Sequence, residues 1–273
     1  MDKESFIISQ FQNEFIGDDG AVIGKWVYSK DIFAEDIHFK KGWLTLSQIA
    51  RKAMLVNISD AIAMNAKPKY ALLGVIVPKD FSSEWIKELV SGFKKTAKEY
   101  GIKIVGGDTT SGEKLVICVT IISNKRKYTL KRTGLKEGDL LAYTGKIGES
   151  LRDLNRLYEG EKISEKSRFI EPVLRGKFIK EAAGYLRCGL DISDGLSKDL
   201  SRLCALANLG VEFLKDFSKD ELCSGEEYEM LIAFAPKYKD KILQIAQKTN
   251  TPIDIFAKAK KGRYESECKE HHF

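Results

Sequence analysis

Ile102-Lys-Ile-Val-Gly-Gly-Asp-Thr-Thr-Ser111 is the stretch around which we expect the chain to be organised. Three of its first four residues are apolar and β-branched, which is typical of a buried strand. The strand runs into Gly106 and Gly107, where no side chain obstructs another backbone or a ligand. Their N–H groups can face a phosphate, and Asp108 can hold the cation that accompanies it. An ordinary turn also explains these residues, so the choice between a turn and a phosphate-binding site depends on the other aspartates of the chain.

Composition limits the possible classes of protein. The 273 residues are 43% hydrophobic, enough for one large or two medium domains with a sizeable core. The net charge is +6, and the densest basic run, Lys125–Lys131, has no aromatic-basic interleaving and no nucleic-acid-binding motif, so we expect no nucleic-acid partner. No apolar run approaches the ~20 residues of a membrane span. We expect a cytoplasmic protein without a membrane partner.

The cysteines and histidines are few. Three histidines (His38, His271 and His272) make a Ser-His-Asp triad or a His-rich zinc site improbable. The five cysteines form an odd set without metal-type spacing, and we expect reduced, mostly buried thiols: Cys118, Cys188, Cys204, Cys223 and Cys268.

Alternating strands and helices predict an α/β fold of two domains, residues 1–130 and 131–273, joined by the polar segment 124–139. In the first domain the expected elements are helices over 1–16 (apolar side Phe6, Ile7, Phe11 and Phe15), 44–66 (with a break near Asn57) and 82–100, and strands over 21–28, 70–77, 102–107 and 114–123. In the second they are strands over 140–144, 188–193, 211–214, 228–234 and 253–257, and helices over 148–159, 167–187, 194–208 and 238–248.

Aspartates recur where these elements end, and each has a local explanation as a turn or cap residue. Asp60 is the exception, because it shares a helix face with Ala53 and Met64 and is therefore expected to be buried. A buried carboxylate is costly unless something pairs with it. No basic residue lies near it in sequence until Lys67, and a Mg²⁺ ion would solve the problem.

The second half carries a matching element, Asp191-Ile-Ser-Asp194-Gly. Asp191 and Ser193 point the same way in an extended segment, and Asp194 turns into a helix N-terminus suited to phosphate. A Walker-type glycine loop is absent. Ser224-Gly-Glu-Glu-Tyr-Glu229 either presents a carboxylate to a ligand or is a turn with solvated acids.

Taken in order, these motifs resemble the thiamine-monophosphate kinases nearly end to end. The wider superfamily includes aminoimidazole ribonucleotide synthetase, selenophosphate synthetase and hydrogenase-maturation proteins. The motifs that carry the resemblance are Gly17-Asp-Asp-Gly-Ala-Val, Ser29-Lys-Asp31, His38-Phe39, Asn57-Ile-Ser-Asp60-Ala-Ile-Ala-Met, Gly106-Gly-Asp-Thr-Thr, Arg132-Thr-Gly, Asp191-Ile-Ser-Asp-Gly-Leu, Gly225-Glu-Glu-Tyr-Glu and His272-Phe273.

The resemblance implies a homodimer in which the N-terminal sheets of two chains join into a barrel. It implies transfer of the γ-phosphoryl group of ATP to thiamine monophosphate, giving thiamine diphosphate, with several Mg²⁺ ions. By position, Mg²⁺ would be held by Asp19, Ser29, Asp31, Asp60, Asp108, Asp191 and Asp194, all but Asp19 and Ser29 being catalytic through the metal. ATP would contact Gly107, Asp108, Arg132 and Ser193, and the thiamine moiety His38 and Glu226.

The chemistry agrees, because both reactants are phosphates and catalysis reduces to charge neutralisation and in-line positioning. Lys30 departs from the family, which usually has threonine there, and so does Glu227, which replaces an aspartate. Two alternatives stay open: another ATP-using enzyme of the superfamily, of the cyclo-ligase type, and a non-enzymatic nucleotide- or metal-binding protein. A selenophosphate synthetase would carry a reactive cysteine early in the chain, and no cysteine precedes Cys118.

Overall fold

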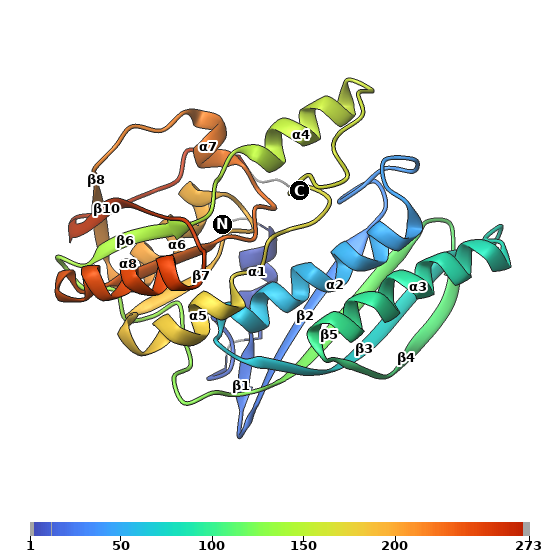
Figure 1. Cartoon of the computed structure of the whole chain (residues 1–273), viewed down its shortest axis with the longest axis horizontal. Coiled ribbons are helices and arrows are strands. Elements are labelled where there is room, and N and C mark those ends of the chain that lie inside the picture. The colour runs from blue at the N-terminus through green and yellow to red at the C-terminus, as the bar shows by residue number, and fades with distance from the viewer. Residues whose placement is uncertain (1–2, 12, 270–273) are drawn as a thin grey trace.

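The chain folds into two five-stranded sheets with helix α2 between them (Figure 1). The computed structural model describes residues 3–11 and 13–269. The first sheet has the strand order β1-β2-β5-β3-β4, and the second has the order β7-β9-β6-β10-β8. Strands and helices alternate along the chain, which confirms the α/β class. No helix in the described ranges combines the length and the apolar character that crossing a membrane requires.

In the first sheet every pairing is antiparallel except that of β3 with β4, which is parallel. The elements of this half are α1 (Lys3–Ser9), β1 (Ala21–Ile23), β2 (Trp26–Ala34), α2 (Leu46–Ala63), β3 (Lys67–Pro78), α3 (Ser83–Tyr100), β4 (Lys103–Gly112) and β5 (Val116–Asn124).

The second sheet is antiparallel throughout. Its half contains β6 (Leu140–Thr144), α4 (Glu149–Tyr158), α5 (Gly176–Ala182), β7 (Cys188–Asp191), α6 (Leu196–Ala207), β8 (Leu209–Phe213), α7 (Lys219–Cys223), β9 (Met230–Phe234), α8 (Lys239–Lys248) and β10 (Ile253–Lys261), with short 3₁₀ turns at Ala183–Tyr185 and Pro236–Tyr238.

Local signals fix the ends of the two long helices. Thr45 accepts a hydrogen bond from the Gln48 N–H while the Gln48 side chain caps back, so α2 begins with a capping box. Ser82 caps α3, and Gly101 ends it with a left-handed φ of 65°. The predicted bounds of α3 are therefore confirmed.

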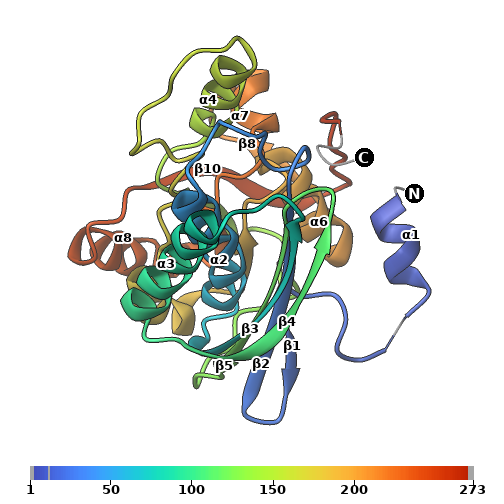
Figure 2. The same cartoon turned by 90° about the vertical axis from the view of Figure 1, so that its right-hand side faces the viewer.

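Helix α2 lies against both sheets and is buried on almost every side (Figures 1 and 2). Ala53, Asn57 and Met64 are buried, and Asp60 is half-buried. The expected break near Asn57 is wrong, because the Asn57 amide donates to the Val119 carbonyl at 2.7 Å instead of competing with the helix backbone. An asparagine that is satisfied by another element leaves the helix intact.

The stretch at 102–111 forms a strand, but the prediction that this strand is buried is wrong. β4 is the edge of the first sheet, and Ile104 and Val105 are 38% and 53% exposed. Helices α2 and α3 cover one face of this sheet (Figure 2). β-branched residues alone do not distinguish a central strand from an apolar edge strand.

Several other bounds differ from the predictions. The helix expected over 1–16 ends at Ser9, and Phe6, Ile7, Phe11 and Phe15 are exposed; residues 1, 2 and 12 lie outside the described ranges. The strand expected over 21–28 is a hairpin, because Gly24 takes a left-handed φ of 57° between β1 and β2. The helix expected over 167–187 shortens to α5. Helix α7 was not predicted.

The cysteine prediction is half right. Cys118, Cys188 and Cys204 are free, and the last two are buried. Cys223 and Cys268 form a disulfide across 45 residues, which joins the end of α7 to the C-terminal segment. The spacing of the cysteines could not indicate this pairing, since it depends on the tertiary fold. The motif residues His272 and Phe273, and His271, lie outside the described residues.

Candidate functional site

Three aspartates from distant parts of the chain meet beside α2. Asp19 precedes β1, Asp60 lies in the last turns of α2, and Asp191 ends β7. Each offers a carboxylate oxygen, and these oxygens lie within 4.8 Å of one another. Both halves of the chain therefore contribute to one carboxylate centre. We call Asp19, Asp60 and Asp191 the aspartate centre.

Repulsion dominates the electrostatics of the aspartate centre. Burial raises the pKa of Asp60 well above its ordinary value, and the charges of Asp31, Asp191 and Asp19 raise it further. The pKa of Asp191 is raised well above its ordinary value in the same way, by burial and by Asp19. Carboxylates crowded in this manner ionise together only when a cation joins them.

The basic residue Arg132 contacts the aspartate centre but does not satisfy all of its carboxylate oxygens. Arg132 contacts Asp19 Oδ1 through Nε at 2.9 Å and through Nη2 at 2.5 Å. The other oxygen, Asp19 Oδ2, is buried and has no hydrogen-bond partner among the described residues. Burial still raises the pKa of Asp19, although Arg132 opposes the rise. An orphaned carboxylate oxygen beside two more carboxylates is the donor set that a hard divalent cation prefers.

Neutral side chains hold the surrounding residues in place. The Ser59 hydroxyl donates to Asp191 Oδ2, which fixes the orientation of that carboxylate. Ser29 is buried on β2, and its hydroxyl donates to Asn57 Oδ1 at 2.7 Å. Asp31, two residues along the same strand, is half-buried and close enough to raise the pKa of Asp60. Ser29 and Asp31 thus lie beside the centre.

Asp194 lies apart from the three converging carboxylates and has its own counter-ions. Its carboxylate contacts Arg202 Nη2 at 2.5 Å and lies 4.0 Å from Lys198 Nζ. Arg202 also binds Asp199 at 2.5 Å, and burial raises the pKa of Asp199 to about 7. This ion-pair network starts one turn beyond the aspartate centre, at the beginning of α6.

A buried lysine connects the two predicted substrate residues. Lys52 Nζ contacts Glu226 Oε2 at 2.8 Å, which joins α2 to the loop before β9. Burial lowers the pKa of Lys52, and Glu226 opposes that shift. The same ammonium lies 5.6 Å from the Phe33 ring centre, and the His38 ring contacts Phe33 at a centroid distance of 5.0 Å. His38 and Glu226 therefore belong to one contact chain across the two halves.

The glycine-aspartate motif has a structural role that sequence reasoning missed. A Cβ on Gly107, whose φ is 149°, would lie 1.7 Å from the Leu73 carbonyl oxygen. The close pairing of β3 with β4 is sufficient to require glycine there. Asp108 is exposed on the edge strand and accepts from the Thr109 N–H at 2.9 Å. It is not part of the aspartate centre. Ser193 is half-buried, and its carbonyl accepts from the Glu226 N–H at 2.7 Å.

The segment Ser224–Glu229 is not a turn with solvated acids, because Glu227 and Glu229 are fully buried. Glu227 Oε1 accepts from the Gly148 N–H at 2.7 Å and the Ser150 N–H at 3.1 Å, at the start of α4. Glu229 Oε2 accepts from Arg175 Nε at 2.7 Å and from the Thr144 hydroxyl at 2.6 Å. These acids stabilise the C-terminal half, and Glu226 alone reaches across to α2.

Sequence reasoning missed Lys52, Tyr228 and Asp199. A lysine inside the apolar run of α2 was a usable signal for Lys52, since a fully buried ammonium needs a partner. Tyr228 is buried with a positive φ of 52°, and burial raises its pKa well above the ordinary value. Nothing in the local sequence indicated that environment.

The fold and the aspartate centre define an α/β protein of the AIR synthase-like class. A family model described as AIR synthase related protein, N-terminal domain, matches residues 17–123. A solved structure of AaThiL complexed with AMPPCP and TMP shares the fold, with a TM-score of 0.84 and 22% identity over 96% of this chain and 90% of that one.

Two curated relatives carry the identification further. Thiamine-monophosphate kinase from Pyrococcus horikoshii is 30% identical in an alignment of 248 positions that covers 82% of this chain and 78% of the relative. The enzyme of the same name from Buchnera aphidicola subsp. Schizaphis graminum is 31% identical in an alignment of 280 positions that covers 90% of this chain and 85% of the relative. The chain therefore belongs to the thiamine-monophosphate kinase family.

Proposed function

We propose that the protein is a thiamine-phosphate kinase that transfers the γ-phosphoryl group of ATP to thiamine monophosphate. The observation that carries this proposal is the aspartate centre, because its members come from both halves and leave the Asp19 Oδ2 atom without a partner. Family membership supplies the two substrates. Two phosphates that repel each other need concentrated positive charge, and crowded carboxylates are the means of gathering it.

Magnesium is part of the proposal, and the donor set fits it. Asp19, Asp60 and Asp191 would hold Mg²⁺, with Asp31 and Ser29 beside them on β2. When bound, Mg²⁺ neutralises charge on the transferring phosphoryl group. The predicted contributions of Asp108 and Asp194 to metal binding stay predictions.

The chain's own residues orient the site. Arg132 fixes Asp19 by two hydrogen bonds and keeps a guanidinium at the centre, where it can contact a nucleotide phosphate. Ser59 fixes Asp191. The Lys52–Glu226 pair joins the halves, and the His38 ring packs against Phe33 beside Lys52, so the thiamine moiety is expected between the two sheets near this pair.

A homodimer is also proposed, in which first sheets of two chains meet. Supporting it, several apolar side chains of that sheet are exposed: Ile32 at 57%, Val105 at 53%, Ile104 at 38% and Leu72 at 37%. Contiguous exposed apolar residues on a sheet mark an interface. Sedimentation velocity would test this, and a monomer at micromolar concentration would contradict it. The expected cytoplasmic location stays a prediction.

A coupled assay of ADP release tests the activity and separates the alternatives. Thiamine monophosphate should stimulate ADP release in the presence of Mg²⁺, with thiamine diphosphate as the second product. Stimulation by aminoimidazole precursors instead would indicate a cyclo-ligase. Nucleotide binding without release under either condition would indicate a non-enzymatic protein. The Asp60→Asn variant is the matched control, since it should remove release without unfolding the chain.

A further inference from the structure

A large cavity lies between the two halves, on a different part of α2 from the aspartate centre. It has a volume of about 700 Å³ and is bounded by the end of α2, the segment after it, the end of α3, and α5. Ile62 and Asn65 line it, whereas Asp19, Asp60 and Asp191 do not. A cavity of this size suits a nucleotide-sized molecule.

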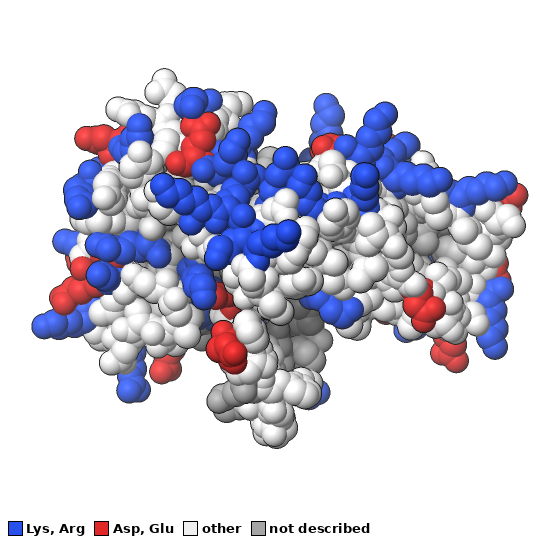
Figure 3. All heavy atoms as spheres, turned by 90° about the horizontal axis from the view of Figure 1, so that it is seen from below, with Lys and Arg blue, Asp and Glu red and all other residues white. Residues whose placement is uncertain are grey.

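The lining is strongly basic. Five basic side chains and one acidic side chain surround the cavity: Lys67, Arg126, Arg175, Lys177 and Lys180, with Glu99. Figure 3 shows Lys and Arg side chains gathered across the middle of the face that is seen from below. Such an excess of one charge raises the local concentration of ligands with the opposite charge.

Most of this positive charge is not compensated within the described chain. Arg175 pairs with Glu229 at 2.6 Å, and Glu99 pairs with Arg51 at 2.7 Å. The charges of Arg175 and Glu99 are therefore already neutralised and do not change the net charge of the lining. The remaining four basic residues make no ion pair with any described residue. Lysines gathered around a hollow without counter-ions repel one another, and an anionic ligand would relieve that repulsion.

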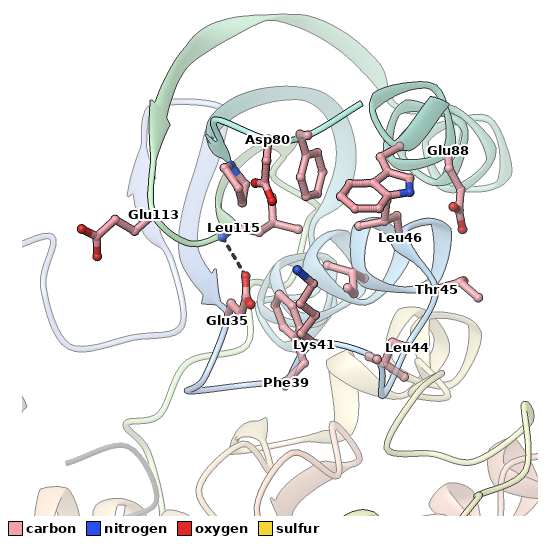
Figure 4. A pocket seen from close by; sticks show the side chains of 15 residues that line it. Glu35, Phe39, Lys41, Leu44, Thr45, Leu46, Asp80, Glu88, Glu113 and Leu115 are labelled. Atoms are coloured by element: carbon pink, nitrogen blue, oxygen red, sulfur yellow. Dashed lines mark hydrogen bonds between the residues drawn. The ribbon is translucent and has the colours of Figure 1, made fainter. Parts of the chain in front are cut away.

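The cavity between the starts of α2 and α3 provides a contrast (Figure 4). Its volume is about 420 Å³, and its walls are largely apolar and aromatic. Lys41 and Asp80 both reach into it, and the Glu35 carboxylate accepts from the Leu115 N–H at 3.0 Å. Charges of both signs give that cavity no preference for an anion. The basic cavity differs because nearly all of its charged side chains are positive.

We propose that the basic cavity binds a small, multiply charged phosphate compound, such as a short polyphosphate or the diphosphate of a nucleotide. A hollow with basic residues on its walls favours a small molecule over a nucleic-acid strand, which follows an extended stripe of cations. Such a ligand would contact both halves at once. It would therefore stabilise their arrangement in addition to binding.

Calorimetric titration in EDTA tests the proposal, with tripolyphosphate, pyrophosphate and ADP as probes. The aspartate centre repels phosphates when metal is absent, so binding in EDTA reports on the basic cavity. Tripolyphosphate should bind, and it should raise the melting temperature through linkage. Comparison of ADP with pyrophosphate shows whether the nucleoside contributes affinity.

Two double variants separate a built site from general attraction to a basic protein. Lys177→Gln/Lys180→Gln removes two charges from the cavity and should weaken tripolyphosphate binding by at least about fivefold. Lys94→Gln/Lys260→Gln removes the same charge from exposed positions outside the lining and should change affinity less than about twofold. If the first pair alters folding, Arg126→Gln serves the same purpose.

Three results would overturn the proposal. One is the absence of binding to wild-type protein in EDTA at a salt concentration of about 50 mM or below, where salt screens charges only weakly. The second is equal weakening by the two double variants. The third is a clear preference for a single-stranded RNA oligonucleotide over tripolyphosphate, which would identify an open nucleic-acid surface.

Discussion

Two carboxylate sites in this protein, Glu229 with its ion pairs and the aspartate centre, differ in how their negative charge is balanced. Glu229 is fully buried, and Arg168, Arg175 and the Thr144 hydroxyl all contact its carboxylate. The aspartate centre brings three carboxylates together with one guanidinium and leaves an oxygen without a partner. The first group is complete without a ligand and stabilises the fold. The second is incomplete, and an unpaired oxygen among crowded carboxylates is what makes it a candidate for a cation.

Replacing Asp60 should separate activity from stability. Asp60→Asn removes a carboxylate that is repelled by its neighbours, so we expect turnover to fall by about 10²–10³-fold or more while the metal-free protein keeps or gains stability. Turnover at saturating Mg²⁺ and urea unfolding in EDTA at pH 8 measure the two effects. A variant with wild-type turnover would remove Asp60 from the mechanism.

Replacing Glu229 should produce the opposite pattern. Glu229→Gln leaves the half-buried Arg175 without its carboxylate and Arg168 with Glu149 alone, and we expect a loss of about 3–5 kcal/mol in the free energy of unfolding. This loss should be the same with Mg²⁺ and with EDTA, since the cluster binds no cation. A destabilisation that appears only with Mg²⁺ would contradict the distinction between the two groups.

We expect Gly107, like Glu229, to stabilise the fold. In Gly107→Val the new Cβ would overlap the Leu73 carbonyl oxygen, so we expect a destabilisation of about 1–3 kcal/mol or more, with loss of the β3–β4 pairing. Thermal unfolding of the apoprotein checks this, and Ser111→Val on the same strand is the control. Native stability together with weakened ATP binding would show that the glycine serves the nucleotide alone.

The sequence predicted the elements well and their surroundings less well. Capping residues at Thr45 and Ser82 and a glycine after α3 were readable, because those signals are local. Asp60 was readable because a carboxylate on an apolar helix face needs a partner. The position of β4 at a sheet edge, the Cys223–Cys268 disulfide and the Lys52–Glu226 pair were not, since each depends on residues distant in the chain.

The pH dependence of the metal-free protein should reflect the raised pKa values of the aspartate centre. An acid whose folded pKa lies above its unfolded value of 3.8 stabilises the fold most below that value and loses this contribution as the pH rises through the folded pKa. We therefore expect stability in EDTA to fall from about pH 4 upward, and Asp199, with a pKa of about 7, extends the fall through neutrality.

Magnesium should oppose this fall, because it binds the ionised carboxylates. The difference in melting temperature between Mg²⁺ and EDTA should thus grow with pH, by a few degrees over the range, and shrink in Asp60→Asn. Melting curves at matched ionic strength from pH 5 to pH 8 measure it. A difference independent of pH would mean that the centre is already ionised without metal.

Lys30 should give the smallest effect of all, although it stands between Ser29 and Asp31 and departs from the family. Its side chain points to the other face of β2, as strand alternation predicts, and donates to Cys118 Sγ at 2.7 Å. An ammonium on that face cannot replace positive charge at the aspartate centre. We expect turnover plotted against free Mg²⁺ to be superimposable for wild type, Lys30→Thr and Lys30→Ala. A shift of the Mg²⁺ requirement in Lys30→Thr, with lower turnover in Lys30→Ala, would instead show that the lysine acts on the transferring phosphate.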